Sequence, residues 1–361
     1  MQPESPHTLW IVGTSVSIEH DGYVARLAPR ARERGFALGN LSIGDQTSLM
    51  GCMRLMGVCA SIRPGDVVVW EYSLLDTLLT VFDPHDVHFA RRLAWREALA
   101  RGARVIVLLV APKTRVRHRS SRERRIVADA RSLGLPCIDT RELALKLGIA
   151  NAASHYRDDR HLRRDSPLID AIAAEVAALL TAGAPSACRV PREWARARRT
   201  WRWLDIAELG ADRATVRKIE NSLVSLDALA LMPGDAIALP PLQRLVAVGC
   251  VSTHGSGGVW CGHATCRPAS TRLPQALGYD FLLRTSGIAC RNGHLERLVS
   301  APAEAYRRGA WRDYGQEAST APGEVLVFGA LVETAASPAD RWLTNLHSRK
   351  RAAYEFLRRF V

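Results

Sequence analysis

Residue types that together perform nucleophilic acyl transfer occur in the first half of the chain. Ser15 follows the apolar run TLWIVG, and Asp158 and His161 lie three residues apart in the downstream segment DDRHL. A serine hydroxyl is a weak nucleophile at neutral pH, so it needs a nearby base, and histidine is the side chain whose ordinary pKa suits that role. A carboxylate on the other ring nitrogen would hold the imidazole in the required tautomer. We therefore interpret Ser15 as the nucleophile, His161 as the general base and Asp158 as the residue that orients it.

The tetrahedral intermediate of this chemistry also needs hydrogen-bond donors for its oxyanion. The segment NLSIG ends in Gly44, which has no Cβ to block close approach, so the backbone N–H groups of Ser15 and Gly44 are the candidate donors. Ser73 and Asp76, in the segment WEYSLLD, are possible supporting residues. Each residue also has a plainer interpretation when it is taken alone: Ser15 could cap a helix, Gly44 could be a turn glycine, and His161 could be a surface histidine in a basic loop.

Short β-rich runs alternate with longer helical patterns up to about residue 183. The strands and helices that these patterns predict must position the candidate residues. The runs are TLWIVG, FALGNLS, DVVVWEY, ARVIVLLV and LPCID. Strands separated by helices of this length predict a parallel sheet that is covered on both faces. Functional groups of such a sheet gather beyond the carboxyl ends of its strands. The candidate nucleophile, oxyanion donor and supporting residues all follow predicted strands.

The order of these segments resembles the SGNH or GDSL-type hydrolases. Block one of that family is similar to GTS, with Ser15 as nucleophile and Thr14 where an Asp is more usual; block two is similar to NLSIG, with Gly44 in the oxyanion role; and the final block is similar to DDRHL. The resemblance covers roughly the first 183 residues. It implies a flavodoxin-like three-layer αβα fold and ester-directed chemistry without a cofactor.

The third block departs from the family pattern. Aligning EYSLLD on it places Leu75 where the family has an Asn whose amide donates to the oxyanion, with Asp76 after it. Loss of one oxyanion donor commonly lowers the rate by about 100- to 1000-fold. The combination of GTS, NLSIG and YSLLD is also similar to a branch of SGNH-like proteins associated with bacterial polysaccharide biosynthesis.

The remainder of the chain predicts a second domain. A chain of 361 residues exceeds one ordinary domain. Residues 184–202 are rich in Pro and Arg and are interpreted as a linker. Short strand-like runs with Gly and Pro between them predict a β-rich domain, a sandwich or jelly roll, over residues 203–338. Residues 339–361 have near-helical apolar spacing and predict a closing helix.

The chain carries a net charge of +13, almost all of its basic excess being Arg. The densest run, KTRVRHRSSRERR, follows the fourth predicted strand and is either a solvated loop and helix start or a rim that recognises an acidic glycan or a carrier phosphate. No helix-turn-helix, RNA-binding sheet signature or zinc finger supports a nucleic-acid partner. A saccharide or acylated glycan is the expected substrate.

Cysteine and histidine spacing does not favour a metal site. Cys261, His263 and Cys266, with Cys290 or His294, have ligand types that zinc prefers, but their spacing matches no common structural zinc motif. We expect reduced thiols and cytoplasmic residence, because no secretory leader is visible. The longest apolar stretch, LIDAIAAEVAALLTAG, carries two acidic residues and predicts an amphipathic helix, not a membrane span.

Two functional hypotheses follow from these residues. The first is an SGNH-like serine esterase or O-acyltransferase that acts on an acylated saccharide, polysaccharide or precursor through a covalent acyl-Ser15 intermediate. The alternative is a non-catalytic glycan-binding or scaffold protein of polysaccharide biosynthesis on a degenerate SGNH fold. Leu75 is the main support for the alternative, and the set of Ser15, Asp158 and His161 argues against it.

Overall fold

A computed structural model describes two compact units of this chain. One comprises Met1–Trp194 with Ser222–Val224, and the other comprises the remainder. The described residues are 6–44, 46–78, 84–181, 200–211, 215–220, 225–231, 236–238, 243–252, 258–261, 264–266, 278–288, 294–298 and 325–334. The predicted C-terminal helix, residues 339–361, lies outside them.

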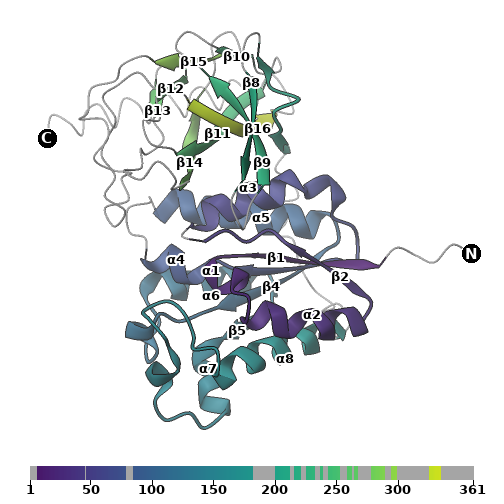
Figure 1. Cartoon of the computed structure of the whole chain (residues 1–361), viewed down its shortest axis with the longest axis vertical. Coiled ribbons are helices and arrows are strands. Elements are labelled where there is room, and N and C mark those ends of the chain that lie inside the picture. Colours follow the sequence, from purple (N-terminus) through teal and green to yellow (C-terminus); the bar gives the residue numbers. More distant parts are fainter. Residues whose placement is uncertain are drawn as a thin grey trace, which may run out of the picture. The chain divides into compact units, whose positions relative to one another are not determined.

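The first unit is built on a five-stranded parallel sheet (Figure 1). Its strands are β1 (His7–Gly13), β2 (Phe36–Asn40), β3 (Val67–Glu71), β4 (Arg104–Leu109) and β5 (Cys137–Asp139), arranged in the order β2-β1-β3-β4-β5. This is the flavodoxin-like strand order. The strands coincide with the five predicted runs, and every residue of β3 is buried, as both-face coverage requires. The predicted flavodoxin-like α/β fold is confirmed.

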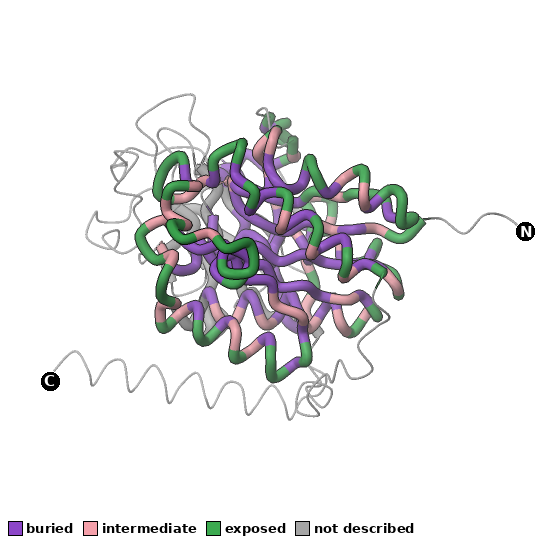
Figure 2. Tube along the Cα trace, turned by 90° about the horizontal axis from the view of Figure 1, so that it is seen from below, coloured by how far each residue is buried: buried purple, intermediate pink, exposed green. Residues whose placement is uncertain are grey.

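Helices cover both faces of this sheet. α3 and α5 lie on one face, and α2 and α8 lie on the other (Figure 1). Buried residues concentrate along the strands and the inner sides of the helices, while exposed residues line their outer sides (Figure 2). The helices are α1 (Ser15–Ile18), α2 (Tyr23–Glu33), α3 (Ser48–Gly57), α4 (Ser73–Leu78), α5 (Pro84–Ala100), α6 (Ser121–Ser132), α7 (Thr140–Lys146) and α8 (Pro167–Thr181), with the 3₁₀ turns η1 (Cys59–Ser61), η2 (Lys113–Arg115) and η3 (Ala152–His155).

An aromatic cluster fixes α3 and α5 against β3. The ring of Trp70 lies edge-on to Trp95, with centroids 6.5 Å apart, and 5.5 Å from Tyr72. Gly51 of α3 permits this packing, because a Cβ there would lie 2.4 Å from the Tyr72 ring. α3 and α5 therefore pack on the same face of β3 and on Tyr72, the residue that follows it.

The α8 helix contains most of the long apolar stretch noted in the sequence. It buries Leu168, Ile169, Ile172, Ala173, Val176, Ala177 and Leu180 and leaves Asp170 exposed. Among the helices described, none has both the length and the apolar character that a bilayer crossing requires.

The second unit is antiparallel. One sheet has the order β13-β12-β15-β10-β7 and the other β14-β11-β16-β9-β8, with β6 paired to β16. The strands are β6 (Thr200–Leu204), β7 (Gly210–Ala211), β8 (Thr215–Glu220), β9 (Ser225–Leu231), β10 (Ala236–Ala238), β11 (Gln243–Ser252), β12 (Gly258–Cys261), β13 (Ala264–Cys266), β14 (Gly278–Ile288), β15 (His294–Leu298) and β16 (Val325–Thr334). This two-sheet unit agrees with the predicted β-rich domain. β6 begins at Thr200, so the last three residues of the expected linker belong to a strand, and the others lie outside the described residues.

Candidate active site

Ser15 lies at a tight junction between β1 and α1. β1 ends at Gly13, Thr14 is the N-cap of α1, and Ser15 is the first residue of that helix. A Cβ at Gly13 would lie 2.3 Å from Ser17 Oγ and 2.8 Å from Glu71 Oε2, so the turn requires glycine. The N-cap is Thr14, which leaves the Ser15 hydroxyl available for another partner.

That partner is His161. Its Nε2 lies 2.8 Å from Ser15 Oγ, and its Nδ1 lies 2.9 Å from both carboxylate oxygens of Asp158. An ionised carboxylate only accepts hydrogen bonds, so it favours a proton on Nδ1 and leaves Nε2 as the acceptor for the serine O–H. The structure thus brings the three sequence-predicted residues into one hydrogen-bonded chain, although they come from opposite ends of the unit.

The Asp158 carboxylate is held in its ionised form. Its Oδ1 accepts hydrogen bonds from the backbone N–H groups of Arg160, at 2.8 Å, and His161, at 2.9 Å. Partial burial raises the pKa of Asp158, but these hydrogen bonds and the His161 ring outweigh it and hold the pKa well below its ordinary value. A charged partner for the imidazole is therefore present throughout the neutral range.

The loop that carries Asp158 and His161 is anchored at both ends. Tyr156 and Leu162 form a β-bridge across its base, and the Tyr156 hydroxyl donates to the Ala111 carbonyl at 2.6 Å. The Arg157 guanidinium reaches Glu19, the C-cap of α1, at 2.7 Å. This ion pair links the loop directly to the helix that begins with Ser15.

Gly44 lies against the candidate nucleophile. The N–H of Ile43 donates to the Gly13 carbonyl at 3.0 Å, which continues the pairing of this segment with β1 beyond β2. A Cβ added at Gly44 would lie 3.7 Å from Ser15 Cβ, in ordinary van der Waals contact. Glycine therefore leaves open a small space beside Ser15. The N–H of Ser15 itself lies in the first turn of α1, where a backbone N–H has no partner within the helix.

Ser73 and Asp76, expected as supporting residues, form their hydrogen bonds elsewhere. Ser73 Oγ donates to the Leu108 carbonyl at 3.3 Å and accepts from the Val110 N–H at 3.1 Å. Asp76 accepts from the backbone N–H and hydroxyl of Ser48, at 2.7 and 2.5 Å. These contacts tie α4 to β4 and α3. Neither residue has the expected supporting contact with the nucleophile, because α4 directs both side chains toward β4 and α3 instead of toward Ser15.

Leu75 is also directed into the core, where its side chain is fully buried. Burial raises the pKa of its neighbour Asp76 against the effect of Arg91 and of the Ser48 hydrogen bonds. The position that the alignment assigned to an oxyanion donor is therefore a packing position.

Glu71 is a residue of this site whose role the sequence did not indicate. It is fully buried at the end of β3, and its Oε2 accepts from the Thr14 N–H (2.8 Å), the Thr14 hydroxyl (2.9 Å) and the Ser17 hydroxyl (3.0 Å). Its Oε1 has no hydrogen-bond partner among the described residues. Burial raises the pKa of Glu71 to about 7, against the opposing effect of these donors. The feature of the sequence that could have indicated Glu71 is a carboxylate at the end of the apolar run VVVWE.

Metal ligands are not assembled in the part of the chain that the structure describes: no group of three His, Cys, Asp or Glu side chains there could hold an ion. Of the second-domain residues weighed in the sequence, His263 and Cys290 lie outside the described residues, and the side chains of Cys261 and Cys266 are not described. Cys52, Cys59 and Cys137 are free thiols.

Comparison with known proteins gives a match in structure but not in sequence. No protein-family model matches the chain, and no curated protein matches it. A two-domain esterase active on acetylated mannans is similar in structure over 91% of both chains, with a TM-score of 0.58 and 10% identity. The same type of esterase, co-crystallised with mannopentaose, gives a TM-score of 0.55 and 12% identity over 92% of this chain and 91% of that one.

A GDSL-like lipase from Bacteroides thetaiotaomicron is similar over 50% of this chain and 92% of its own, with a TM-score of 0.37 and 16% identity. The similarity over 91% of both chains shows that this protein has the fold of that two-domain esterase, in which a parallel α/β unit is joined to an antiparallel β unit.

Proposed function

We propose that this protein is an SGNH-type serine esterase that removes acyl groups from an acylated saccharide. The observation that carries the proposal is the chain of hydrogen bonds from Ser15 Oγ through His161 to Asp158, with heavy-atom distances of 2.8 and 2.9 Å. Such distances are within the range that proton transfer between a nucleophile and its base requires.

In the first half of the proposed reaction, Ser15 Oγ attacks the acyl carbonyl carbon while its proton passes to His161 Nε2. The carbonyl oxygen becomes an oxyanion that accepts hydrogen bonds from the N–H groups of Ser15 and Gly44. Collapse of this intermediate breaks the bond to the sugar oxygen, which takes the proton from His161 Nε2. Asp158 stabilises the imidazolium that forms in between.

In the second half, water gives a proton to His161 and attacks the acyl-Ser15 carbonyl, and Ser15 leaves with that proton as the free acid is released. A sugar hydroxyl in place of water would make the protein an O-acyltransferase by the same steps. The proposal of a saccharide substrate is supported by the acetylated mannans on which the structurally similar esterase acts.

The test is ester cleavage that depends on Ser15. Wild-type protein should release acetate from acetylated manno-oligosaccharides and p-nitrophenol from p-nitrophenyl acetate, and Ser15→Ala should lose both activities by about 10³-fold or more. Ser61→Ala, at an exposed serine of η1, is the matched control and should retain them. Equal rates for wild type and Ser15→Ala would overturn the proposal.

A non-catalytic glycan-binding protein on the same fold is the second candidate, and the burial of Leu75 favours it. With no side-chain amide at this position, the oxyanion would have only the two backbone donors. This candidate predicts saturable binding of a manno-oligosaccharide in calorimetry with no acetate released from its acetylated form.

A further inference from the structure

The arginine-rich run at residues 113–125 separates into two groups in the structure. Arg119 is part of the internal framework, with ion pairs to Asp139 at 2.8 Å and Glu142 at 2.5 Å. Arg122 and Arg125 instead line a cavity of about 310 Å³, which we call the arginine pocket. Its lining residues are Asp76, Val87, His88, Arg91, Ser121, Arg122, Arg125 and Ile126.

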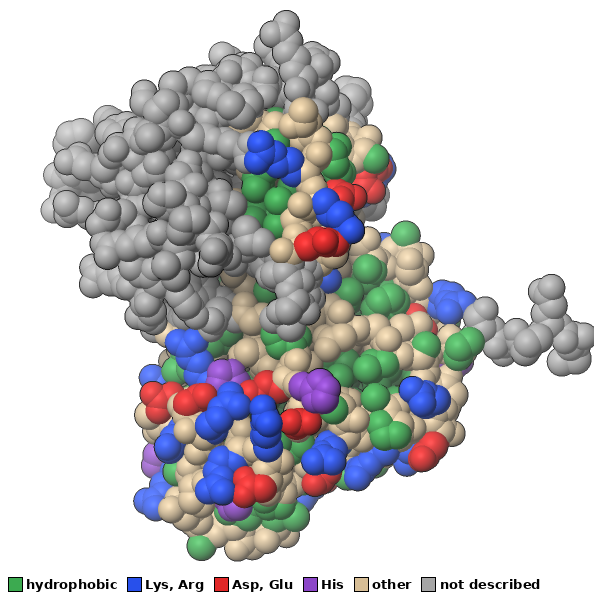
Figure 3. All heavy atoms as spheres, in the orientation of Figure 1, with side chains coloured by type: hydrophobic (Ala, Val, Ile, Leu, Met, Phe, Trp, Pro, Cys, Tyr) green, Lys and Arg blue, Asp and Glu red, His purple; other side chains and the backbone are tan. Residues whose placement is uncertain are grey.

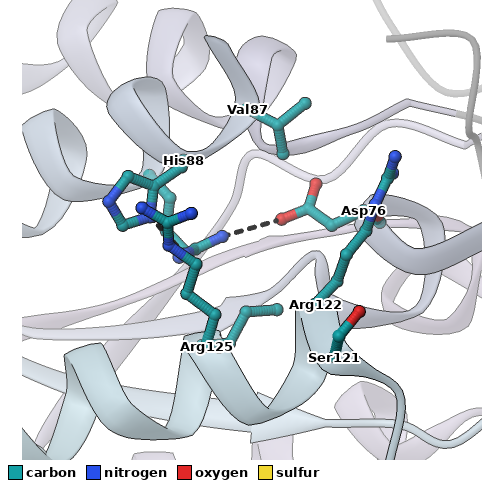
Figure 4. A pocket seen from close by; sticks show the side chains of 8 residues that line it. Asp76, Val87, His88, Ser121, Arg122 and Arg125 are labelled. Atoms are coloured by element: carbon teal, nitrogen blue, oxygen red, sulfur yellow. Dashed lines mark hydrogen bonds and ion pairs between the residues drawn. The ribbon is translucent and has the colours of Figure 1, made fainter. Parts of the chain in front are cut away.

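Three helices form the arginine pocket. Ser121, Arg122 and Arg125 extend from α6, Val87 and His88 face them from α5, and Asp76 of α4 lies between (Figure 4). Lys and Arg side chains are numerous on the α/β unit and are interspersed with Asp and Glu (Figure 3). Surface charge alone therefore does not distinguish the pocket from the rest of the unit. The contacts of its lining residues have to be compared instead.

Arg91 is a buried cation that lines the pocket. Its side chain is 4% exposed and forms ion pairs with Asp76, at 3.5 Å, and Asp129, at 2.9 Å. Its Nε has no hydrogen-bond partner in the described structure. Because this Nε is itself inaccessible to solvent, Arg91 contributes positive charge to the wall of the pocket and not a hydrogen bond from Nε to a ligand.

The α6 side of the pocket supplies further positive charge. Arg125 is exposed and has no hydrogen bond or ion pair to a described residue, and Arg122 donates to the Asp76 carbonyl at 2.8 Å. Ser121 is the first residue of α6, a helix of 12 residues whose N-terminal end attracts anions. Among the described residues, the lining of the pocket thus includes three guanidinium groups and one carboxylate.

The two described carboxylates at the pocket, those of Asp76 and Asp129, already have partners. The Asp76 carboxylate accepts from Ser48 and pairs with Arg91, and Asp129 pairs with Arg91 and with His88 Nδ1 at 3.0 Å. In the part of the chain that the structure describes, three guanidinium groups and one carboxylate thus line the pocket, and Asp129 pairs with Arg91 without being a lining residue. This excess of guanidinium groups suits an anionic ligand.

The pocket lies at the same edge of the sheet as Ser15. α4 follows β3 directly, α6 follows β4, and the first turns of α5 lie at this edge because its last turn leads into β4. β3 and β4 are the first and second neighbours of β1 on this side, and adjacent strands are about 4.8 Å apart. The ends of β1 and β4 are thus separated laterally by roughly 10 Å, so a substrate bound at Ser15 would have to extend along this edge of the sheet to reach the pocket.

We propose that the arginine pocket binds a phosphate group carried by the saccharide substrate. The identity of the ligand as substrate rests on the proposed esterase function; the phosphate site itself does not. A phosphate, with up to two charges and several acceptor oxygens, uses Arg91, Arg122 and Arg125 more fully than a singly charged carboxylate does. The cavity volume also leaves room for part of an attached sugar.

Calorimetry on the full-length Ser15→Ala variant at low ionic strength tests the pocket without turnover. The probes are glucose 1-phosphate, inorganic phosphate, glucuronate and glucose. Glucose 1-phosphate should bind most tightly, inorganic phosphate more weakly, and glucose should not bind measurably. Adding Arg125→Gln should weaken glucose 1-phosphate by about tenfold, because one charge-assisted contact is lost at an exposed position.

Arg124→Gln is the matched control, since it removes the same charge from an exposed neighbour on α6 that is not a lining residue. It should leave the affinity within about twofold. Equal weakening by both substitutions, no binding of either phosphate probe, or tighter binding of glucuronate than of glucose 1-phosphate would overturn the phosphate pocket. If phosphate binds while wild-type protein cleaves no ester, the proposed esterase function fails and the pocket stands.

Discussion

Glu71 at the end of β3 accepts two hydrogen bonds from Thr14, the residue that precedes Ser15: one from its backbone N–H at 2.8 Å and one from its hydroxyl at 2.9 Å. The register of the sheet produces this contact, because Gly13 and Glu71 are directly paired across β1 and β3. A buried carboxylate thus fixes the turn from which the candidate nucleophile projects.

The raised pKa of Glu71 has a consequence for stability. A carboxyl whose pKa is higher in the folded chain, about 7 against 4.5, favours folding fully below pH 4.5, and this contribution is lost as pH rises toward 7. Glu71→Gln keeps an acceptor for Thr14 and Ser17 without titrating. Its free energy of unfolding relative to wild type should therefore rise between pH 4.5 and 7.5, by on the order of 3 kcal/mol at most.

Chemical denaturation of both proteins at the two pH values measures this difference. Glu33→Gln, at an exposed position of α2, is the control and should show no such change. If wild type and Glu71→Gln respond to pH in parallel, the buried carboxyl does not titrate in this range.

Asp158 should act only through His161. Asp158→Asn removes the charge that fixes the imidazole tautomer, and we expect kcat for ester cleavage to fall by about 10³- to 10⁴-fold. The unfolding midpoint should fall only modestly, because the Asp158 side chain is 47% exposed and an Asn oxygen can still accept from the N–H groups of Arg160 and His161. Asp159→Asn, at the exposed neighbouring carboxylate, should leave kcat within about twofold. Comparable losses in the two variants would remove Asp158 from the proposed role.

Gly44→Ala tests the space beside Ser15. The added Cβ would meet Ser15 Cβ at 3.7 Å, which the fold tolerates, but it would occupy the space proposed for the acyl oxygen. We expect kcat/KM to fall by roughly 10- to 100-fold with an unchanged unfolding midpoint. Full activity in this variant would exclude Gly44 as a close neighbour of the reacting group.

Leu75→Asn tests whether a family-like amide can be restored. Leu75 is fully buried, so an Asn there loses apolar packing and leaves amide groups without partners. We expect the protein to lose about 2–4 kcal/mol of stability and to gain no activity. An increase in kcat for ester cleavage would show that this position does face the oxyanion.

The sequence could predict the α/β unit because its determinants are local. Buried parallel strands need nearly continuous apolar runs such as VVVWE, and the helices between them show their own spacing. Ser15, Asp158 and His161 could be found because few residue types perform this chemistry and their order follows a known pattern. The structure adds the distances that place the three side chains together.

Contacts between distant side chains could not be predicted in this way. Nothing in the sequence states that Glu71 meets Thr14, because the register of β1 on β3 decides it. Ser73 and Asp76 follow β3 as expected, but the helix they belong to sets the direction of their side chains toward Leu108 and Ser48. The ion pair between Arg91 of α5 and Asp129 of α6 likewise joins residues that are distant in the sequence, and packing of the two helices decides it.

The most direct test of the account is covalent labelling of the nucleophile. A serine-directed phosphonate, followed by peptide mapping in the mass spectrometer, should place a single adduct on Ser15 of the wild-type protein. His161→Ala should react at least about 100-fold more slowly, since its Ser15 has no base, whereas the exposed-histidine control His20→Ala should react at the wild-type rate. Labelling of another residue, or a rate for Ser15 that does not depend on His161, would contradict the account.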